Sequence, residues 1–291
     1  MEWTLKRDGW QAVVRDMGAE LISLTGPQGK EYMWSGDPTY WSGRNPVLFP
    51  MVGRIPEGKT VFEGVPHELS KHGFARGSVF ALVERGEDFI TLELRESEAT
   101  LAQYPYPFRL TITHRLTDAG FSTEYRVDNP GEKAMPFCIG GHPAFLCPQY
   151  EGERFEDYEL VFDEEETCET LRFPKSGHLD LNLRRPFLDH SRSYALNREI
   201  FREEDTIMPI GLRSTGVTLR HRETGHGVYM TAPDFPMLAF WSPDNGPFLC
   251  LEPWQGCPPV DGEGEEFSAK RFCVTLRPGE SKTLVYTIQI V

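Results

Sequence analysis

The sequence lacks most of the features that mark a secreted or membrane-bound protein. Its six cysteines form no Cys-x-x-Cys pair, and its 291 residues contain no Asn-x-Ser/Thr glycosylation acceptor. The N-terminal stretch MEWTLKRDGWQAVV has no apolar core like that of a signal peptide. No apolar run approaches the length of a membrane span. We therefore expect a cytoplasmic protein whose cysteines are reduced and act as small apolar side chains.

Positive charge is also scarce. The chain carries 30 Lys and Arg against 44 Asp and Glu, which gives a formal net charge of −14. No uniform positive field is therefore present to hold a polyanion. We expect neither nucleic acid nor a membrane surface as a partner, but a small-molecule ligand bound by a monomer or a homodimer.

Long helices are difficult to place, because 27 Gly and 23 Pro are spread over the whole chain. Either residue costs a helix interior about 1 to 3 kcal/mol. Alternation of apolar and polar residues instead predicts half-buried strands, at residues 89–96, 108–117, 121–129, 272–278 and 282–291.

Two further segments have a distinct local pattern. In SEATLAQY (97–104) a serine cap precedes Ala and Leu, which predicts one short helix that ends before Pro105. The acidic run DEEET (163–167) predicts a solvated turn between strands. No repeat, linker or composition shift marks a boundary. We therefore expect a single all-β domain over residues 1–291, antiparallel, with a few short helices.

Two motif matches fail because of their context. GRIPEGKT (53–60) fits the Walker A pattern, but Gly64 and Pro66 follow where the phosphate-binding helix would begin, so a strand and turn is predicted. HELSKH (67–72) resembles the zinc motif HExxH, yet its second histidine comes one position too late. The sequence also lacks the Gly-x-Ser-x-Gly elbow of hydrolases and the His-x-His signature of cupins. We expect no metal and no cofactor.

Three titratable side chains remain, each in a segment of rigid backbone. His72 lies in KHGFARG, His142 in GGHPAF and Glu252 in FLCLEPWQG. Glu252 follows an apolar run and precedes Trp254, so we expect desolvation to raise its pKa and make it a proton acceptor near neutral pH. A histidine ring titrates near about 6.5 and can donate a proton. Proton transfer would then be the whole of the chemistry.

Aromatic residues are frequent near these motifs, and an aromatic face packs well against the C–H face of a pyranose. We expect half or more of them to be plain core. The residues in question are Trp41, Phe74, Phe145, Trp241 and Trp254.

Four motif residues follow one another along the chain: the Arg of VGRI, the His of HGFAR, the His of GHPAF and the Glu of LEPW. With these motifs in this order, the sequence resembles the aldose 1-epimerase (galactose mutarotase) superfamily, most closely its LacX-like branch. The resemblance runs from about residue 10 to the C-terminus. It implies a β-supersandwich with a shallow sugar site on one sheet face. The activity it implies is the interconversion of α and β anomers of a hexose or related sugar by ring opening and closure.

The resemblance also implies roles for single residues. Glu252 would be the general base at the anomeric hydroxyl, and His142 the general acid at the ring oxygen. His72 would position or protonate that oxygen, and Arg54 would hold hydroxyls. We expect Gly141 to let the backbone beside His142 approach the sugar closely.

An aspartate that binds sugar hydroxyls also belongs to the family pattern. Asp205 in EEDTIMPIGLRS is our candidate, and Asp180 in GHLDLN is the alternative. HGFAR differs from the corresponding run of galactose mutarotases, so free galactose is not assured as the substrate.

Two alternative functions stay open at this point. A hexose-6-phosphate mutarotase shares the HGFAR string, and Arg54, Lys71 and Arg76 would hold its phosphate, unless Arg76 only pairs with an acidic neighbour. A non-catalytic carbohydrate-binding module would keep the groove without the chemistry. In each case Trp254 is expected to contact the sugar.

Overall fold

The computed structural model describes residues 1–118, 120–172, 178–204 and 206–291. Every named strand pair in these ranges is antiparallel, and only two short α-helices occur there, α1 (Glu98–Gln103) and α2 (Arg198–Glu204). The predicted all-β antiparallel architecture is therefore confirmed. No helix in these ranges is both long and apolar enough to span a bilayer.

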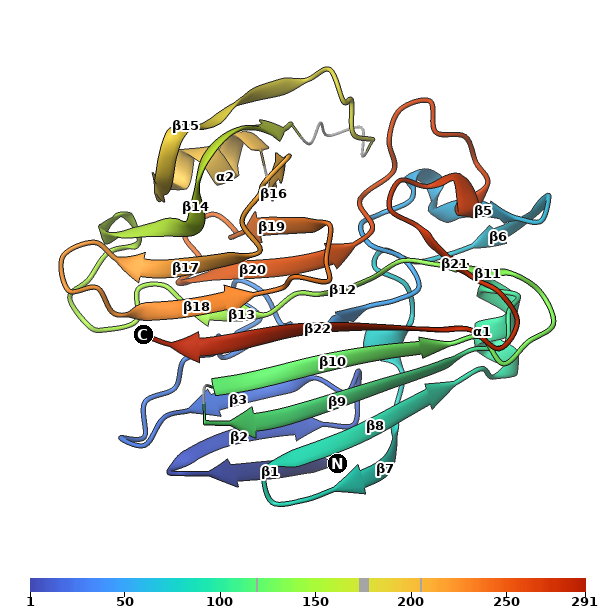
Figure 1. Cartoon of the computed structure of the whole chain (residues 1–291), viewed down its shortest axis with the longest axis horizontal. Helices are drawn as coiled ribbons and strands as arrows, with labels where there is room; N and C mark the ends of the chain where they lie inside the picture. Colours follow the sequence, from blue (N-terminus) through green and yellow to red (C-terminus); the bar gives the residue numbers. More distant parts are fainter. Residues whose placement is uncertain (119, 173–177, 205) are drawn as a thin grey trace.

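One large sheet of 15 strands runs through the whole molecule (Figure 1). In spatial order its strands are β4 (Val47–Leu48), β12 (Ile139–Gly141), β20 (Phe248–Gln255), β19 (Met237–Trp241), β16 (Thr206–Ile210), β14 (Tyr158–Leu171), β17 (Gly216–His221), β18 (Gly227–Thr231), β22 (Ser281–Ile290), β10 (Gly120–Asp128), β9 (Arg109–Thr117), β8 (Phe89–Arg95) and β7 (Ala81–Arg85). Off this path, β13 (Ala144–Leu146) pairs with β20 and β15 (Arg184–Ala195) pairs with β14.

Three smaller sheets complete the fold. They are formed by β1 (Glu2–Arg7), β2 (Trp10–Arg15) and β3 (Leu21–Thr25), by β5 (Lys59–Phe62) with β6 (Val65–Glu68), and by β11 (Met135–Phe137) with β21 (Val274–Leu276). Figure 1 shows β1 to β3, in blue, at the same end of the molecule as β8 and β9. In the described part of the chain, four short 3-10 helices lie in the connections, η1 (Pro56–Gly58), η2 (Ala75–Gly77), η3 (Phe155–Asp157) and η4 (Phe267–Ala269).

The strands form where apolar and polar residues alternate in the sequence. Along β9 every second side chain is buried and its neighbours are half-buried, as the period of a strand with one core face requires. The strands predicted at 89–96, 108–117, 121–129, 272–278 and 282–291 correspond to β8, β9, β10, β21 and β22. The core is rich in aromatic rings, including the fully buried Tyr104, Phe108 and Phe121.

The predicted short helix is α1, and its cap is reciprocal. The Thr100 N–H donates to Ser97 Oγ at 3.3 Å, and the Ser97 N–H donates to Thr100 Oγ1 at 2.8 Å. These bonds satisfy two donors that a helix start would otherwise leave unpaired. The rejected Walker A segment continues into the hairpin of β5 and β6, as its glycine and proline predicted.

The prediction of a solvated turn at residues 163–167 is wrong. This acidic run lies inside β14, where the pairing with β15 shifts register between Val161 and Glu166. Glu166 is buried, and its carboxylate accepts hydrogen bonds from the backbone N–H of Arg213 and from the N–H and hydroxyl of Ser214. Those donors stabilise the buried charge, so the chain bulges and continues as a strand.

A buried histidine in β9 makes the stability of the fold depend on pH. The two ring nitrogens of His114 lie 2.8 Å from the Ala19 carbonyl oxygen and 3.0 Å from Thr123 Oγ1. Burial lowers the pKa of His114 to about 4, from an ordinary value of 6.5. The unfolded chain therefore binds more protons between these values, and stability falls as the pH drops through that window.

We expect this single group to remove about 3 kcal/mol of unfolding free energy between neutral pH and pH 4. Urea unfolding at several pH values measures the slope. His114→Gln, which can still donate to Ala19, should lower stability at neutral pH and flatten the acid slope. An unchanged slope in this variant would show that other groups cause the acid sensitivity.

Candidate active site

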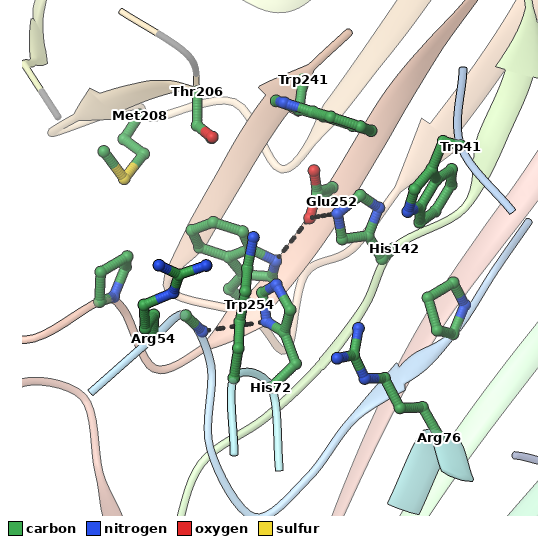
Figure 2. Close-up of a pocket in the computed structure, with 14 residues that line it drawn as sticks. Trp41, Arg54, His72, Arg76, His142, Thr206, Met208, Trp241, Glu252 and Trp254 are labelled. Atoms are coloured by element: carbon green, nitrogen blue, oxygen red, sulfur yellow. Dashed lines mark hydrogen bonds and ion pairs between the residues drawn. The ribbon is translucent and has the colours of Figure 1, made fainter. Parts of the chain in front are cut away.

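Seven of the eight predicted site residues line one cavity of about 330 Å³ (Figure 2). Its walls come from segments far apart in the sequence. They are Trp41, Pro46, Gly53, Arg54, Lys71, His72, Arg76, His142, Thr206, Met208, Trp241, Glu252, Trp254 and Pro258. The predicted site residues on these walls share a single hollow, as the resemblance implied. They are Glu252, His142, His72, Arg54, Lys71, Arg76 and Trp254.

Strand β20 presents Glu252 and Trp254 to the cavity. Residues two apart on a strand point to the same face, so the indole lies beside the carboxylate. The Trp254 Nε1–H donates to Glu252 Oε2 at 3.2 Å, and Glu252 is only 1% exposed. The carboxylate is therefore held in one orientation in a largely water-free position.

His142 follows β12 and reaches the same carboxylate oxygen. Its Nε2 lies 3.2 Å from Glu252 Oε2 (Figure 2). The imidazole packs beside two indoles, with ring centroids 4.7 Å from Trp41 and 5.6 Å from Trp241. The two rings limit how far the imidazole can turn, so its contact with the carboxylate is maintained.

His72 is held by Gly53 through two reciprocal hydrogen bonds. The Gly53 N–H donates to His72 Nδ1 at 3.1 Å, and the His72 N–H donates to the Gly53 carbonyl at 2.8 Å. Because Nδ1 accepts the hydrogen bond from Gly53, the neutral ring carries its own proton on Nε2. His72 and His142 are edge to face, with ring centroids 5.9 Å apart.

Both histidines are neutral in this environment, which corrects the expectation that they titrate near 6.5. Burial, followed by the charge of Lys71, lowers the pKa of His142 to about 3. Burial also lowers the pKa of His72 well below its ordinary value, and His142, Lys71, Arg76 and Arg54 add to that effect. The charged form of either ring is disfavoured unless an anion lies against it.

Three cationic side chains line the cavity near His72. Figure 2 shows Arg54 and Arg76 on opposite sides of the His72 ring. Both guanidinium groups are on exposed residues, and neither forms an ion pair with any residue that the structure describes. The interpretation in which Arg76 only pairs with an acidic neighbour therefore finds no such neighbour in the described ranges. The cavity can accommodate an anionic group.

The comparisons with known proteins agree with this geometry. The family model described as Aldose 1-epimerase matches residues 1–289. The chain belongs to the aldose 1-epimerase family. The chromosomal LacX protein of Lactococcus lactis is 37% identical over 298 residues, which covers 99% of this chain and 98% of LacX.

Two solved structures share the fold of this family member over its whole length. A galactose mutarotase related enzyme from Lactobacillus acidophilus has a TM-score of 0.94 at 27% identity, and covers 100% of this chain and 97% of its own. A galactose mutarotase-like protein from Lactobacillus casei has a TM-score of 0.93 at 27% identity, with 100% of both chains covered. The predicted supersandwich of the galactose mutarotase type is therefore confirmed.

The two candidate aspartates of this epimerase-family chain have different outcomes. Asp205 lies outside the described residues, between α2 and the cavity-lining Thr206. Asp180 is described and does not line the cavity. Its carboxylate instead accepts the Asn182 N–H at 2.8 Å within a turn. Asp180 is therefore not a sugar-binding residue of this cavity.

Some of the cavity walls were not predicted from the sequence, and one expectation fails. Thr206 and Met208 face the cavity from β16, next to the loose motif that suggested Asp205. Residues 206–210 (TIMPI) do not alternate between polar and apolar residues, so no sequence pattern indicated Thr206 and Met208. Gly141 does not line the cavity. A Cβ there would lie 3.0 Å from Tyr125 Oη and 3.2 Å from the Tyr286 ring, so this glycine makes room for tyrosines and not for a sugar.

Metal-ligating atoms do gather in two places among the described residues. At the cavity wall, ligand atoms of His142 and Glu252 lie within 4.8 Å of each other and of the Cys250 thiol, which does not line the cavity, and Glu153, His221 and His226 form a second group elsewhere. Burial, followed by the charge of Glu252, raises the pKa of Cys250 well above its ordinary value, so its thiol is a weak ligand. The contact between His142 and Glu252 suits proton transfer directly.

Proposed function

We propose that this protein is an aldose 1-epimerase, which interconverts the α and β anomers of a hexose or related sugar. The observation that carries the proposal is the 3.2 Å contact between Glu252 Oε2 and His142 Nε2 on the wall of the cavity. A base and a potential acid on neighbouring positions can act on two oxygens of one sugar ring.

In this mechanism Glu252 removes the proton from the anomeric hydroxyl while His142 donates a proton to the ring oxygen. The bond between C1 and the ring oxygen breaks, the C1–C2 bond rotates, and closure returns both protons in reverse. No covalent intermediate with the protein is needed. His72 supplies a neutral Nε2–H that positions the sugar, since its Nδ1 accepts the Gly53 N–H.

Protonation of His142 is the demanding step of this mechanism. Burial lowers the pKa of His142 to about 3, so the imidazolium is a minor form near neutral pH. The Glu252 carboxylate beside Nε2 is the group that stabilises that form. We infer that the two residues act as a pair, whose working state holds the proton on His142 and the negative charge on Glu252.

The aromatic walls suit the carbon face of a sugar. Trp41, Trp241 and Trp254 line the cavity, and indole rings pack well against C–H groups. The expected reduced cysteines fit a cytoplasmic location for this activity. Polarimetry or anomeric NMR exchange, on a panel of sugars and sugar phosphates, tests the proposal. A purified protein that binds hexose and leaves mutarotation at its spontaneous rate would instead be a carbohydrate-binding module.

A second candidate function is mutarotation of a hexose 6-phosphate. It is favoured by Arg54 and Arg76, which line the cavity without an ion-pair partner among the described residues. Guanidinium groups bind phosphate oxygens with two parallel hydrogen bonds. A phosphate at the cavity mouth would accept such hydrogen bonds from Arg54 and Arg76 without displacing an existing salt bridge.

Arg76→Gln separates the two candidates. If the phosphate is part of the substrate, we expect KM for glucose 6-phosphate to rise by about 10-fold or more, because charge-assisted hydrogen bonds are lost. KM for glucose should change by less than about twofold, since no charge on the sugar is involved. Steady-state polarimetry measures both. Arg95→Gln, an exposed arginine on β8, is the matched control. Equal changes for both sugars would argue against a phosphate site.

A further inference from the structure

Two cysteines are brought together at the end of a short strand pair. Strands β11 and β21 are antiparallel, and Phe137 is the partner of Val274 at the end of their ladder. Cys138 follows Phe137 and Cys273 precedes Val274, so the two cysteines flank the end of this ladder, one residue beyond its last pair. Residues directly opposite in an antiparallel pair have Cα atoms about 4.5 to 5.5 Å apart. Disulfides need Cα atoms about 4.4 to 6.8 Å apart.

The two thiols also contact each other. The hydrogen bond with Cys273, followed by burial, raises the pKa of Cys138 well above its ordinary value, and both cysteines are free thiols. The end of the ladder brings the two residues near each other, and the hydrogen bond brings their thiols into contact. A third thiol, that of Cys257, is close enough to act on Cys138 electrostatically.

The two cysteines differ in how far solvent reaches them. Cys138 has an exposed fraction of 0%, whereas Cys273 is half-buried. A small reagent in solution therefore reaches Cys273 first. The inner thiol is protected from direct attack, yet it touches the outer one. This is the arrangement of an attacking and a resolving cysteine.

We propose that Cys138 and Cys273 form a redox-active dithiol, which closes to a disulfide on reaction with a low-molecular-weight disulfide such as oxidised glutathione. The Cys273 thiolate attacks one glutathione sulfur, which forms a mixed disulfide and releases one glutathione thiolate. Cys138 then gives its proton to the released glutathione thiolate, attacks the Cys273 sulfur and releases the second glutathione thiolate. Two protein thiols are oxidised, one glutathione disulfide is reduced, and the two protons pass to the released thiols.

The dithiol adjoins the strands that hold the candidate catalytic residues. Cys138 directly precedes β12, whose Gly140 pairs with Trp254 of β20. On the other side, a Cβ built on Gly256 would lie 3.0 Å from Cys138 Sγ, so the end of β20 is packed tightly against this thiol. Closing the disulfide brings the two sulfur atoms to about 2.05 Å from each other, which moves the Cys138 side chain against the strands packed on it. We therefore expect the disulfide to change the spacing of His142 and Glu252.

The test uses the full-length protein in glutathione buffers of graded oxidation. Free thiols are alkylated, and the peptide that joins Cys138 to Cys273 is measured by mass spectrometry. We expect this peptide to appear in oxidising buffer and to disappear on reduction with dithiothreitol. Oxidation should lower the mutarotation rate at least about tenfold, because small displacements at a reacting centre are costly.

Three variants serve as controls. Cys273→Ser should abolish the cross-link and leave activity insensitive to glutathione, while Cys168→Ala on β14 should behave as the wild type. Cys257→Ala should retain the cross-link. Absence of the cross-linked peptide in the most oxidising buffer, or a cross-link through Cys257, would overturn the proposed pair. A cross-link that leaves the rate unchanged would overturn its effect on activity. The peptide is read by mass, so failure of the proposed mutarotase function leaves this test intact.

Discussion

Glu252→Gln is expected to lower kcat for mutarotation at least about 100-fold, the usual effect of removing a general base. The amide oxygen can still accept the Trp254 Nε1–H, which lies 3.2 Å from the present carboxylate. The shape of the cavity is therefore retained. The amide cannot take up the anomeric proton, so the loss falls on kcat and not on sugar binding.

The rate is measured by anomeric NMR exchange and binding by calorimetry. Glu252→Asp retains a carboxylate one methylene shorter, and we expect its rate to lie between those of the wild type and the amide. Glu98→Gln, on the exposed start of α1, controls for charge loss outside the cavity. If the amide variant keeps full kcat, Glu252 is not the base.

His142→Asn is expected to cause a similar loss, at least about 100-fold in kcat. The amide nitrogen of asparagine takes the place of the imidazole Nδ1, so it stops short of the present Nε2, and it cannot deliver a proton to the ring oxygen. The double variant with Glu252→Gln should be little worse than either single variant, because residues that act as a unit are not additive.

The pH profile distinguishes an acid from a residue that only packs. Burial lowers the pKa of His142 to about 3, so the fraction of imidazolium grows as the pH falls. After subtraction of the spontaneous reaction, kcat of the wild type should rise between about pH 8 and about pH 6. His142→Asn should lose this rise. A wild-type rate that falls over the same range would contradict the proposed acid.

The strands could be predicted from the sequence because their pattern is local. Alternation along β8, β9 and β10 depends only on which side chains face the core, and the Ser97 cap of α1 is likewise a matter of a few neighbouring residues. The acidic run at 163–167 could not be predicted in this way. Its buried Glu166 is satisfied by donors from Ser214 and Arg213, which are remote in sequence.

The same distinction applies to the site. The motifs around His72, His142 and Glu252 identified the side chains of the site. No motif specifies the distances between these side chains. The lowered pKa of His142 has burial as its main cause, and the neighbouring walls include Trp41 and Trp241, which come from distant segments. Environment of this kind depends on the assembled fold, so the neutral state of both rings was not predictable.

The cavity walls extend from Trp41 to Pro258 in the sequence and include residues from β16, β19 and β20. The cavity that we propose binds sugar therefore cannot form in any partly folded fragment of the chain. Contacts between remote segments form late and slowly during folding, so the binding-competent state arises only with the complete native structure. A bound sugar would consequently hold the whole molecule together against unfolding, and not one part of it alone.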